Sequence, residues 1–208
     1  MNLLCNAVDF CFLDGLYTCR FRYGHAHLSN TITQCEVYEI TTSKDCPDGL
    51  FLRAQGICKI MSVLSDLALG KHAEQSSTHL SYGAEYAVDG NRGTNILKDK
   101  CAHTYKDDTN PWWRVDLQAV YSIISVRILN RGIDEYGDFS FRLRDVTVTV
   151  GLTESDVNTP CGFFAGPGTL SQLVVIDCPT LPQGRFVKIS KTTRALTLCE
   201  VDVFGVSV

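Results

Sequence analysis

The sequence lacks the features of three large functional classes. Its 19 Lys and Arg residues are outnumbered by 23 Asp and Glu residues, giving a net charge of −4. Binding of nucleic acids needs a basic surface, so this class of partner is excluded. No uninterrupted apolar run approaches the roughly 20 residues that span a bilayer, which argues against membrane insertion. Repeated C-x-x-C pairs, which would indicate a zinc site, are also missing.

Cysteine, in contrast, is abundant. The chain has 10 cysteines in 208 residues, and this even number favours disulfides in an oxidising, extracellular compartment. The first residues do not resemble a signal peptide, because they carry no basic residue and Asp9 and Asp14 interrupt the apolar stretch. Either export follows an unusual route, or the chain is part of a longer secreted protein; we favour the second interpretation.

The cysteines are distributed unevenly, which predicts two regions. Residues 1–64 form a cysteine-rich N-terminal segment, and residues 65–208 form a self-sufficient domain. Six cysteines allow 15 disulfide pairings, among which the sequence cannot choose. Cys46 with Cys58 is the simplest local pair, because Pro47-Asp48-Gly49 provides a turn between them. The six are Cys5, Cys11, Cys19, Cys35, Cys46 and Cys58.

A short internal repeat links the two regions. Residues 26–37 and residues 189–201 both end in Cys-Glu-Val after a stretch rich in Ser and Thr. One explanation is chance similarity between two β-strands. The other is that the N-terminal residues are the tail of an earlier copy of the same domain, with a disulfide loop after it.

The second region has the pattern of an all-β domain. Apolar residues alternate with polar ones in short segments bounded by turn sequences such as Asp89-Gly90-Asn91, and no segment predicts a helix of three turns. Short strands with one apolar face favour a two-sheet sandwich or jelly roll. The alternating residues include Ile124, Val126 and Ile128, then Val146, Val148 and Val150.

Several sequence blocks in this region are similar to the F-type lectin (fucolectin) family. The most specific is Pro111 to Leu117, with the sequence PWWRVDL, placed between a histidine and an arginine. The resemblance extends from Leu67 to Phe204 and implies a jelly-roll β-sandwich. Its other blocks are residues 67–71, 75–77, 87–92, 101–103, 130–132 and 198–201.

By this resemblance, His103, Arg131 and Arg142 would hold a sugar. Guanidinium groups offer rigid donor pairs to ring oxygens and hydroxyls, and the histidine can donate to an axial hydroxyl. Taken singly, each residue has a simpler explanation, as a solvated loop histidine or a weak surface ion pair. The loop before Arg142 is longer than the family pattern, so Arg144 competes with Arg142 for the second arginine role.

Aromatic residues near these positions have two interpretations each. Tyr136, Phe139 or Phe141 could pack on the apolar face of a sugar, or one of them could anchor the loop to the core. We expect Trp112 and Trp113 to fill the core instead of stacking on a ligand. We also expect Arg114 and Asp116 to form a structural ion pair.

The resemblance also implies a structural calcium ion below the site. Two carboxylates and four backbone carbonyls would supply the oxygen ligands that Ca²⁺ prefers. The alternative is a tight turn and an unrelated surface acid. The family positions correspond to Tyr86, Asp89, Asn91, Lys100, Cys199 and Glu200.

Two disulfides are expected. Cys101 with Cys199 would lie beside the proposed ion, and Cys161 with Cys178 would close a loop of 16 residues. A catalytic pair of Cys101 and His103 is disfavoured by the even cysteine count.

Together these features predict a secreted lectin for terminal L-fucose or similar sugars. Its partners would be fucosylated glycans on glycoproteins or cell surfaces, and the resemblance implies a role in innate defence. Weak single sites would require tandem repeats or a homo-oligomer for avidity. The alternative is a discoidin-like module for adhesion to cell surfaces or lipids. An enzyme is rejected, because no acid and base are organised as a pair: adjacent acids on turns, such as Asp107-Asp108, rarely converge on one glycosidic bond.

Overall fold

The computed structural model describes residues 7–13, 16–21, 35–43, 51–54, 57–63 and 65–208. Contacts divide the chain into two units, Met1–Ser65 and Asp66–Val208. The boundary expected from the cysteine distribution lies between residues 64 and 65. Both the pairing of Cys46 with Cys58 and the repeat at residues 26–37 rest partly on residues outside the described ranges, so they stay predictions.

The first unit contains one antiparallel sheet of five strands in the order β2-β1-β3-β5-β4. Its central strand β3 pairs with β1 on one side and with β5 on the other. The strands are β1 (Ala7–Leu13), β2 (Leu16–Phe21), β3 (Cys35–Ser43), β4 (Phe51–Ala54) and β5 (Ile57–Val63).

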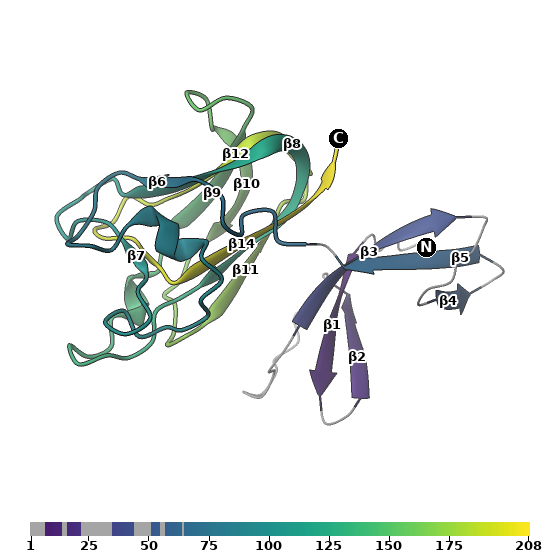
Figure 1. The fold of residues 1–208 in the computed structure, drawn as a ribbon, viewed down its shortest axis with the longest axis horizontal. Helices are drawn as coiled ribbons and strands as arrows, with labels where there is room; N and C mark the ends of the chain where they lie inside the picture. Colours follow the sequence, from purple (N-terminus) through teal and green to yellow (C-terminus); the bar gives the residue numbers. More distant parts are fainter. Residues whose placement is uncertain (1–6, 14–15, 22–34, 44–50, 55–56, 64) are drawn as a thin grey trace. The chain divides into compact units, whose positions relative to one another are not determined.

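The second unit is a β-sandwich in which the described helical segments are two short 3₁₀ turns (Figure 1). The expected all-β fold is therefore confirmed. The elements are β6 (Ala73–Gln75), η1 (Ala84–Ala87), β7 (Ala102–His103), β8 (Trp112–Leu129), η2 (Ser140–Arg142), β9 (Val146–Gly151), β10 (Thr159–Phe164), β11 (Leu173–Asp177), β12 (Gln183–Ser190), β13 (Thr197–Leu198) and β14 (Glu200–Ser207).

The long strand β8 organises this unit. Its first part pairs with β6 and β12, and β12 continues the sheet through β9 to β10. Its last part pairs with β11 on one side and β14 on the other. Residues 118–120 between these parts are exposed, and Gln118 has a positive φ of 67°. Strand β8 thus joins the group β6, β12, β9 and β10 to the group β11 and β14.

Alternating side chains of these strands form one core. Trp113, Val115 and Leu117 of β8 pack with residues of β9, β11, β12 and β14. The expected alternation in β9 is confirmed, because Val146, Val148 and Val150 are all buried. Alternation in the second part of β8 is shifted, however. Ile123, not Ile124, is buried with Val126 and Ile128.

A β-bulge explains this shift. Phe204 of β14 pairs with Ser125, while the next residue, Gly205, pairs with Ile123, so Ile124 has no opposite partner in that register. An extra residue in one strand turns the following side chains to the other face. The apolar run Ile123-Ile124 therefore contains its buried member one position earlier than simple alternation predicts.

Two disulfides lie in the second unit, and both expected pairs are confirmed. They join Cys101 to Cys199 and Cys161 to Cys178. Cys101 and Cys199 also pack with Tyr82, Ile96 and Leu129 in a second small apolar cluster. In the described part of the chain, no helix is long and apolar enough to cross a membrane.

Candidate functional site

His103 lies at the end of the short strand β7, which is held on both sides. β7 pairs with β13, where Thr197 is opposite His103. The His103 amide donates to the carbonyl of Tyr82 at 3.1 Å, and the His79 amide donates to the carbonyl of His103 at 2.9 Å. The disulfide at Cys101 fixes the segment two residues earlier. These contacts give the imidazole a defined position.

Burial, with the neighbouring charges, keeps this imidazole neutral. His103 is 6% exposed, and its ring lies 5.2 Å from that of His79. Burial lowers the pKa of His103 to about 4, with smaller contributions from His79, Arg131 and Arg142. At neutral pH the ring therefore offers one N–H donor and one acceptor nitrogen. Its Nδ1 is covered and has no hydrogen-bond partner among the described residues.

Arg131 and Arg142 approach the same aromatic ring. The guanidinium carbon of Arg142 lies 4.3 Å from the centre of the Phe139 ring, and that of Arg131 lies 5.2 Å from it. The two cations are close enough that Arg131, after burial, lowers the pKa of Arg142. Because both also lower the pKa of His103, the three sequence-predicted residues belong to one electrostatic group.

Asp134 is a member of this group that the sequence analysis missed. Its carboxylate is fully buried and forms an ion pair and hydrogen bond with the guanidinium of Arg131. A second guanidinium nitrogen, Nε of Arg131, is covered and unpaired within the described ranges. The pair fixes the orientation of Arg131. The available signal was an acid three residues after an arginine, which is common in loops and therefore weak.

Arg144 occupies a different position from Arg142. Its guanidinium lies 6.0 Å from the Phe141 ring, and its Nε donates to the Phe141 carbonyl at 3.1 Å. Phe139 is half-buried, whereas Tyr136 and Phe141 are exposed. Of the two candidate arginines, Arg142 is thus the one grouped with Arg131, and Phe139 is the aromatic residue that supports both.

Two expectations about neighbouring residues need correction. Trp113 fills the core and donates from Nε1 to the Ala84 carbonyl at 3.0 Å, but Trp112 is half-exposed. Adjacent residues of a strand point to opposite faces, so only one of the two indoles can enter the core.

The expected ion pair of Arg114 with Asp116 is also wrong. Arg114 pairs with Glu74 and Glu154, each at 2.6 Å, while Asp116 pairs with Arg185 at 2.6 Å. The neighbouring strands β6 and β12 supply Glu74 and Arg185, and the loop between β9 and β10 supplies Glu154.

Of the residues expected to hold calcium, Glu200 is buried and Asp89 lies near enough to raise its pKa. The Glu200 side chain, 1% exposed, accepts from the Gly90 amide at 3.1 Å through one carboxylate oxygen. Gly90 has a φ of 80°, which favours glycine in the turn between Asp89 and Asn91. The ammonium of Lys100, which lies over the Tyr82 ring, has no lone pair, so only the backbone carbonyl of Lys100 could serve as a ligand. Tyr86 and Cys199 lie on the segments that flank this turn and Glu200.

The environment of the Glu200 carboxylate suits a hard cation. The second carboxylate oxygen of Glu200 is covered and has no hydrogen-bond partner among the residues that the structure describes. Burial raises the pKa of Glu200 to about 8, and the nearby Asp202 and Asp89 add to this effect. An unpaired oxygen beside other acids is costly without a compensating charge. The covered Glu200 oxygen, with Asp89 and Asp202 near it, therefore fits a bound Ca²⁺.

Comparison with known proteins gives consistent results. Residues 86–189 match a family model described as NedA-like, galactose-binding domain. A fucolectin of Anguilla anguilla is 37% identical over 137 residues, covering 64% of this chain and 80% of its own length.

Two solved structures are similar in both fold and sequence. A mutant lectin-binding domain of lectinolysin in complex with Lewis b has a TM-score of 0.60 and 30% identity, covering 69% of this chain and 97% of that one. A fucose-binding module of Streptococcus pneumoniae has a TM-score of 0.58 and 28% identity, covering 68% and 96%. In all three cases the match covers about two thirds of this chain, the proportion occupied by residues 66–208.

Proposed function

The chain belongs to the F-type lectin family, and we propose that it binds terminal L-fucose, or a sugar of similar stereochemistry, through His103, Arg131 and Arg142. It is a carbohydrate-binding protein and not an enzyme, as its relatives are lectins and binding modules. The partners would be fucosylated glycans on glycoproteins or cell surfaces.

The observation that carries this proposal is a neutral imidazole in the electrostatic field of two guanidiniums that share the Phe139 ring. Guanidiniums donate hydrogen bonds and accept none, so they favour a ligand rich in oxygen lone pairs. The neutral ring of His103 adds one donor without adding a third charge. A neutral sugar meets these requirements, and Phe139 offers an aromatic surface for its C–H groups.

Calorimetric titration with L-fucose tests the proposal. Arg142→Lys removes the paired donors but keeps the charge, so we expect the dissociation constant for L-fucose to rise about ten-fold or more. Arg144→Lys is the matched control, because Arg144 lies over Phe141 and outside the group; its affinity should change less than about two-fold. Absence of L-fucose binding, or equal affinities for the two variants, would contradict the assignment.

We further propose that Ca²⁺ binds beside Glu200 and stabilises the loop that precedes His103. Asp89 and Glu200 would supply carboxylate oxygens, and Tyr86, Asn91, Lys100 and Cys199 would supply backbone carbonyls. The bound ion supplies positive charge to the covered Glu200 oxygen, and it has no role in contacting the sugar. Calcium should raise the melting temperature of the wild type. In Glu200→Gln the increase should be absent, and an equal increase would exclude this ligand set.

Secretion, a role in innate defence and avidity through repeated domains or oligomers are parts of the same proposal. A single shallow site that engages few groups binds weakly, so useful binding to a cell surface needs several linked sites. Analytical ultracentrifugation with binding to a fucose-coated surface would test this part. The proposal would be contradicted by a monomer whose affinity for the fucose-coated surface is no higher than its affinity for free L-fucose.

A further inference from the structure

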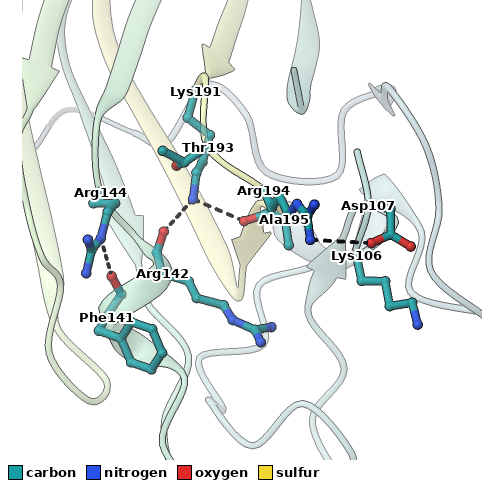
Figure 2. A pocket seen from close by; sticks show the side chains of 9 residues that line it. All are labelled: Lys106, Asp107, Phe141, Arg142, Arg144, Lys191, Thr193, Arg194 and Ala195. Carbon is teal, nitrogen blue, oxygen red and sulfur yellow. Dashed lines mark hydrogen bonds and ion pairs between the residues drawn. The ribbon is translucent and has the colours of Figure 1, made fainter. Parts of the chain in front are cut away.

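A basic pocket lies next to the proposed sugar site and shares Arg142 with it (Figure 2). Its volume is about 420 Å³. The lining contains five cationic side chains and one carboxylate, a net charge of +4 in a protein whose whole sequence carries −4. The charged lining residues are Lys106, Asp107, Arg142, Arg144, Lys191 and Arg194.

The single carboxylate neutralises little of this charge. Asp107 lies 3.8 Å from the guanidinium of Arg194, and the two side chains are 56% and 74% exposed. Exposed pairs at this distance are weak and easily exchanged for another anion. Arg142 and Arg144 contact aromatic rings and no carboxylate among the described residues. The pocket therefore keeps an excess of positive charge that its own residues do not balance.

Lys191 is a buried cation that backbone carbonyls hold in place at this pocket. The residue is 4% exposed, and its ammonium donates to the carbonyls of Arg142 and Ala195, the latter at 3.1 Å. Figure 2 shows the ammonium between these two carbonyls. The third N–H has no partner within the described part of the chain. Burial lowers the pKa of Lys191 to about 8; Asp145, outside the lining, opposes this, while Arg144 and Arg142 add to it.

An unpaired hydroxyl provides an independent observation. Thr193 lines the same pocket, and its Oγ1 is covered without a hydrogen-bond partner in the described ranges. Covered polar groups without partners are uncommon in native proteins and often belong to sites that a ligand or water completes. A hydroxyl that lines one pocket together with an ammonium and guanidiniums gives a donor set suited to several oxygens of one anion.

From this arrangement we propose that the pocket binds an acidic group, a carboxylate or a sulfate ester, on the saccharide next to the fucose. The inference rests on the proposed function, because Arg142 would contact both groups. The size fits a second sugar ring with its acidic substituent, and the exposed side of the pocket lets the glycan continue. The chain would thus prefer acidic fucosylated glycans to their neutral counterparts.

The test compares three fucosylated oligosaccharides that differ in one substituent: none, a sulfate ester or a sialic acid. Calorimetric titration of the full chain at low salt should give at least about five-fold tighter binding of one acidic glycan or both, and the preference should shrink at high salt. The double variant Lys106→Gln/Arg194→Gln should lose the preference and keep the affinity for the neutral glycan. Lys71→Gln/Lys98→Gln removes the same charge elsewhere and should keep the preference.

The outcomes separate the two proposals. Equal binding of neutral and acidic glycans, with free L-fucose still bound, overturns the acidic pocket and leaves the lectin function intact. A preference that survives in Lys106→Gln/Arg194→Gln, or that disappears equally in the Lys71→Gln/Lys98→Gln control, also overturns it. Failure to bind free L-fucose overturns the proposed function and the inference together. A preference for only the sulfated or only the sialylated glycan supports the pocket and identifies the acidic group.

Discussion

The burial of His103 predicts a specific loss of stability in acid. In the folded state burial lowers the pKa of this imidazole from 6.5 to about 4. In the unfolded chain the ring is solvated and titrates at its ordinary value. Between these two pKa values the unfolded state binds the additional proton, so the free energy of unfolding falls as the pH is lowered. The contribution of His103 to the free energy of unfolding is complete above pH 6.5 and is lost as the pH approaches 4.

The size of the effect follows from the shift. Each pKa unit corresponds to about 1.4 kcal/mol, so the difference between 6.5 and about 4 amounts to roughly 3 kcal/mol. Other acids also titrate in this range; Asp66, for example, has a pKa raised by burial to about 6. The relevant quantity is therefore the difference between the wild type and His103→Gln, in which the shared contributions cancel.

Urea denaturation followed by tryptophan fluorescence provides the measurement. Both tryptophans of the sequence, Trp112 and Trp113, belong to the second unit, so the signal reports on the unit that contains His103. From pH 7 to pH 4 the wild type should lose about 3 kcal/mol more than His103→Gln. An identical pH dependence of the two proteins would refute the reasoning. So would a His103 pKa above 6 in an NMR titration of the imidazole resonances.

Three further predictions concern single contacts of the second unit. Trp113→Phe removes the donor to the Ala84 carbonyl and should lower the free energy of unfolding by about 1–3 kcal/mol in urea denaturation, with L-fucose affinity unchanged; equal stability would show that this bond contributes nothing. Replacing Cys161 and Cys178 with serine should cost about 3 kcal/mol by the same assay and leave L-fucose affinity unchanged, so a large change in affinity would contradict the separation of this bridge from the site. Asp134→Asn breaks a buried ion pair and should both destabilise the protein, by about 3 kcal/mol, and weaken L-fucose binding in calorimetry; unchanged affinity would show that the pair does not orient its arginine.

Much of the fold could be predicted because strands record burial with a period of two. Val146, Val148 and Val150 appear as alternating apolar residues in the sequence and as buried residues in the structure. The method failed where the period is interrupted, as at Ile124 beside the bulge. The prediction for Trp112 was also wrong, because the residue type indicates a large aromatic side chain but not the face of the sheet to which that side chain points.

The candidate site was less accessible to sequence reasoning, because its members meet only through tertiary structure. His103, Arg131 and Arg142 could be nominated from a family pattern, but their grouping depends on segments far apart in the chain. Arg131 and Arg142 share the Phe139 ring, and both lower the pKa of His103. Asp134 and Lys191 gave no comparable signal. Their importance comes from burial, and a buried ionic residue looks in sequence like any solvated one.

The pairing of β14 with β8 affects the order in which the protein can mature during synthesis. Residues 200–207 complete a sheet whose partner strand was translated about 70 to 90 residues earlier, and Cys199 closes a bridge to Cys101 from the same late segment. The ribosome must therefore deliver nearly all of this region before the unit can close. Until then the edge of β8 that β14 covers stays unpaired, and oxidation of Cys101 with Cys199 can only follow the synthesis of residue 199.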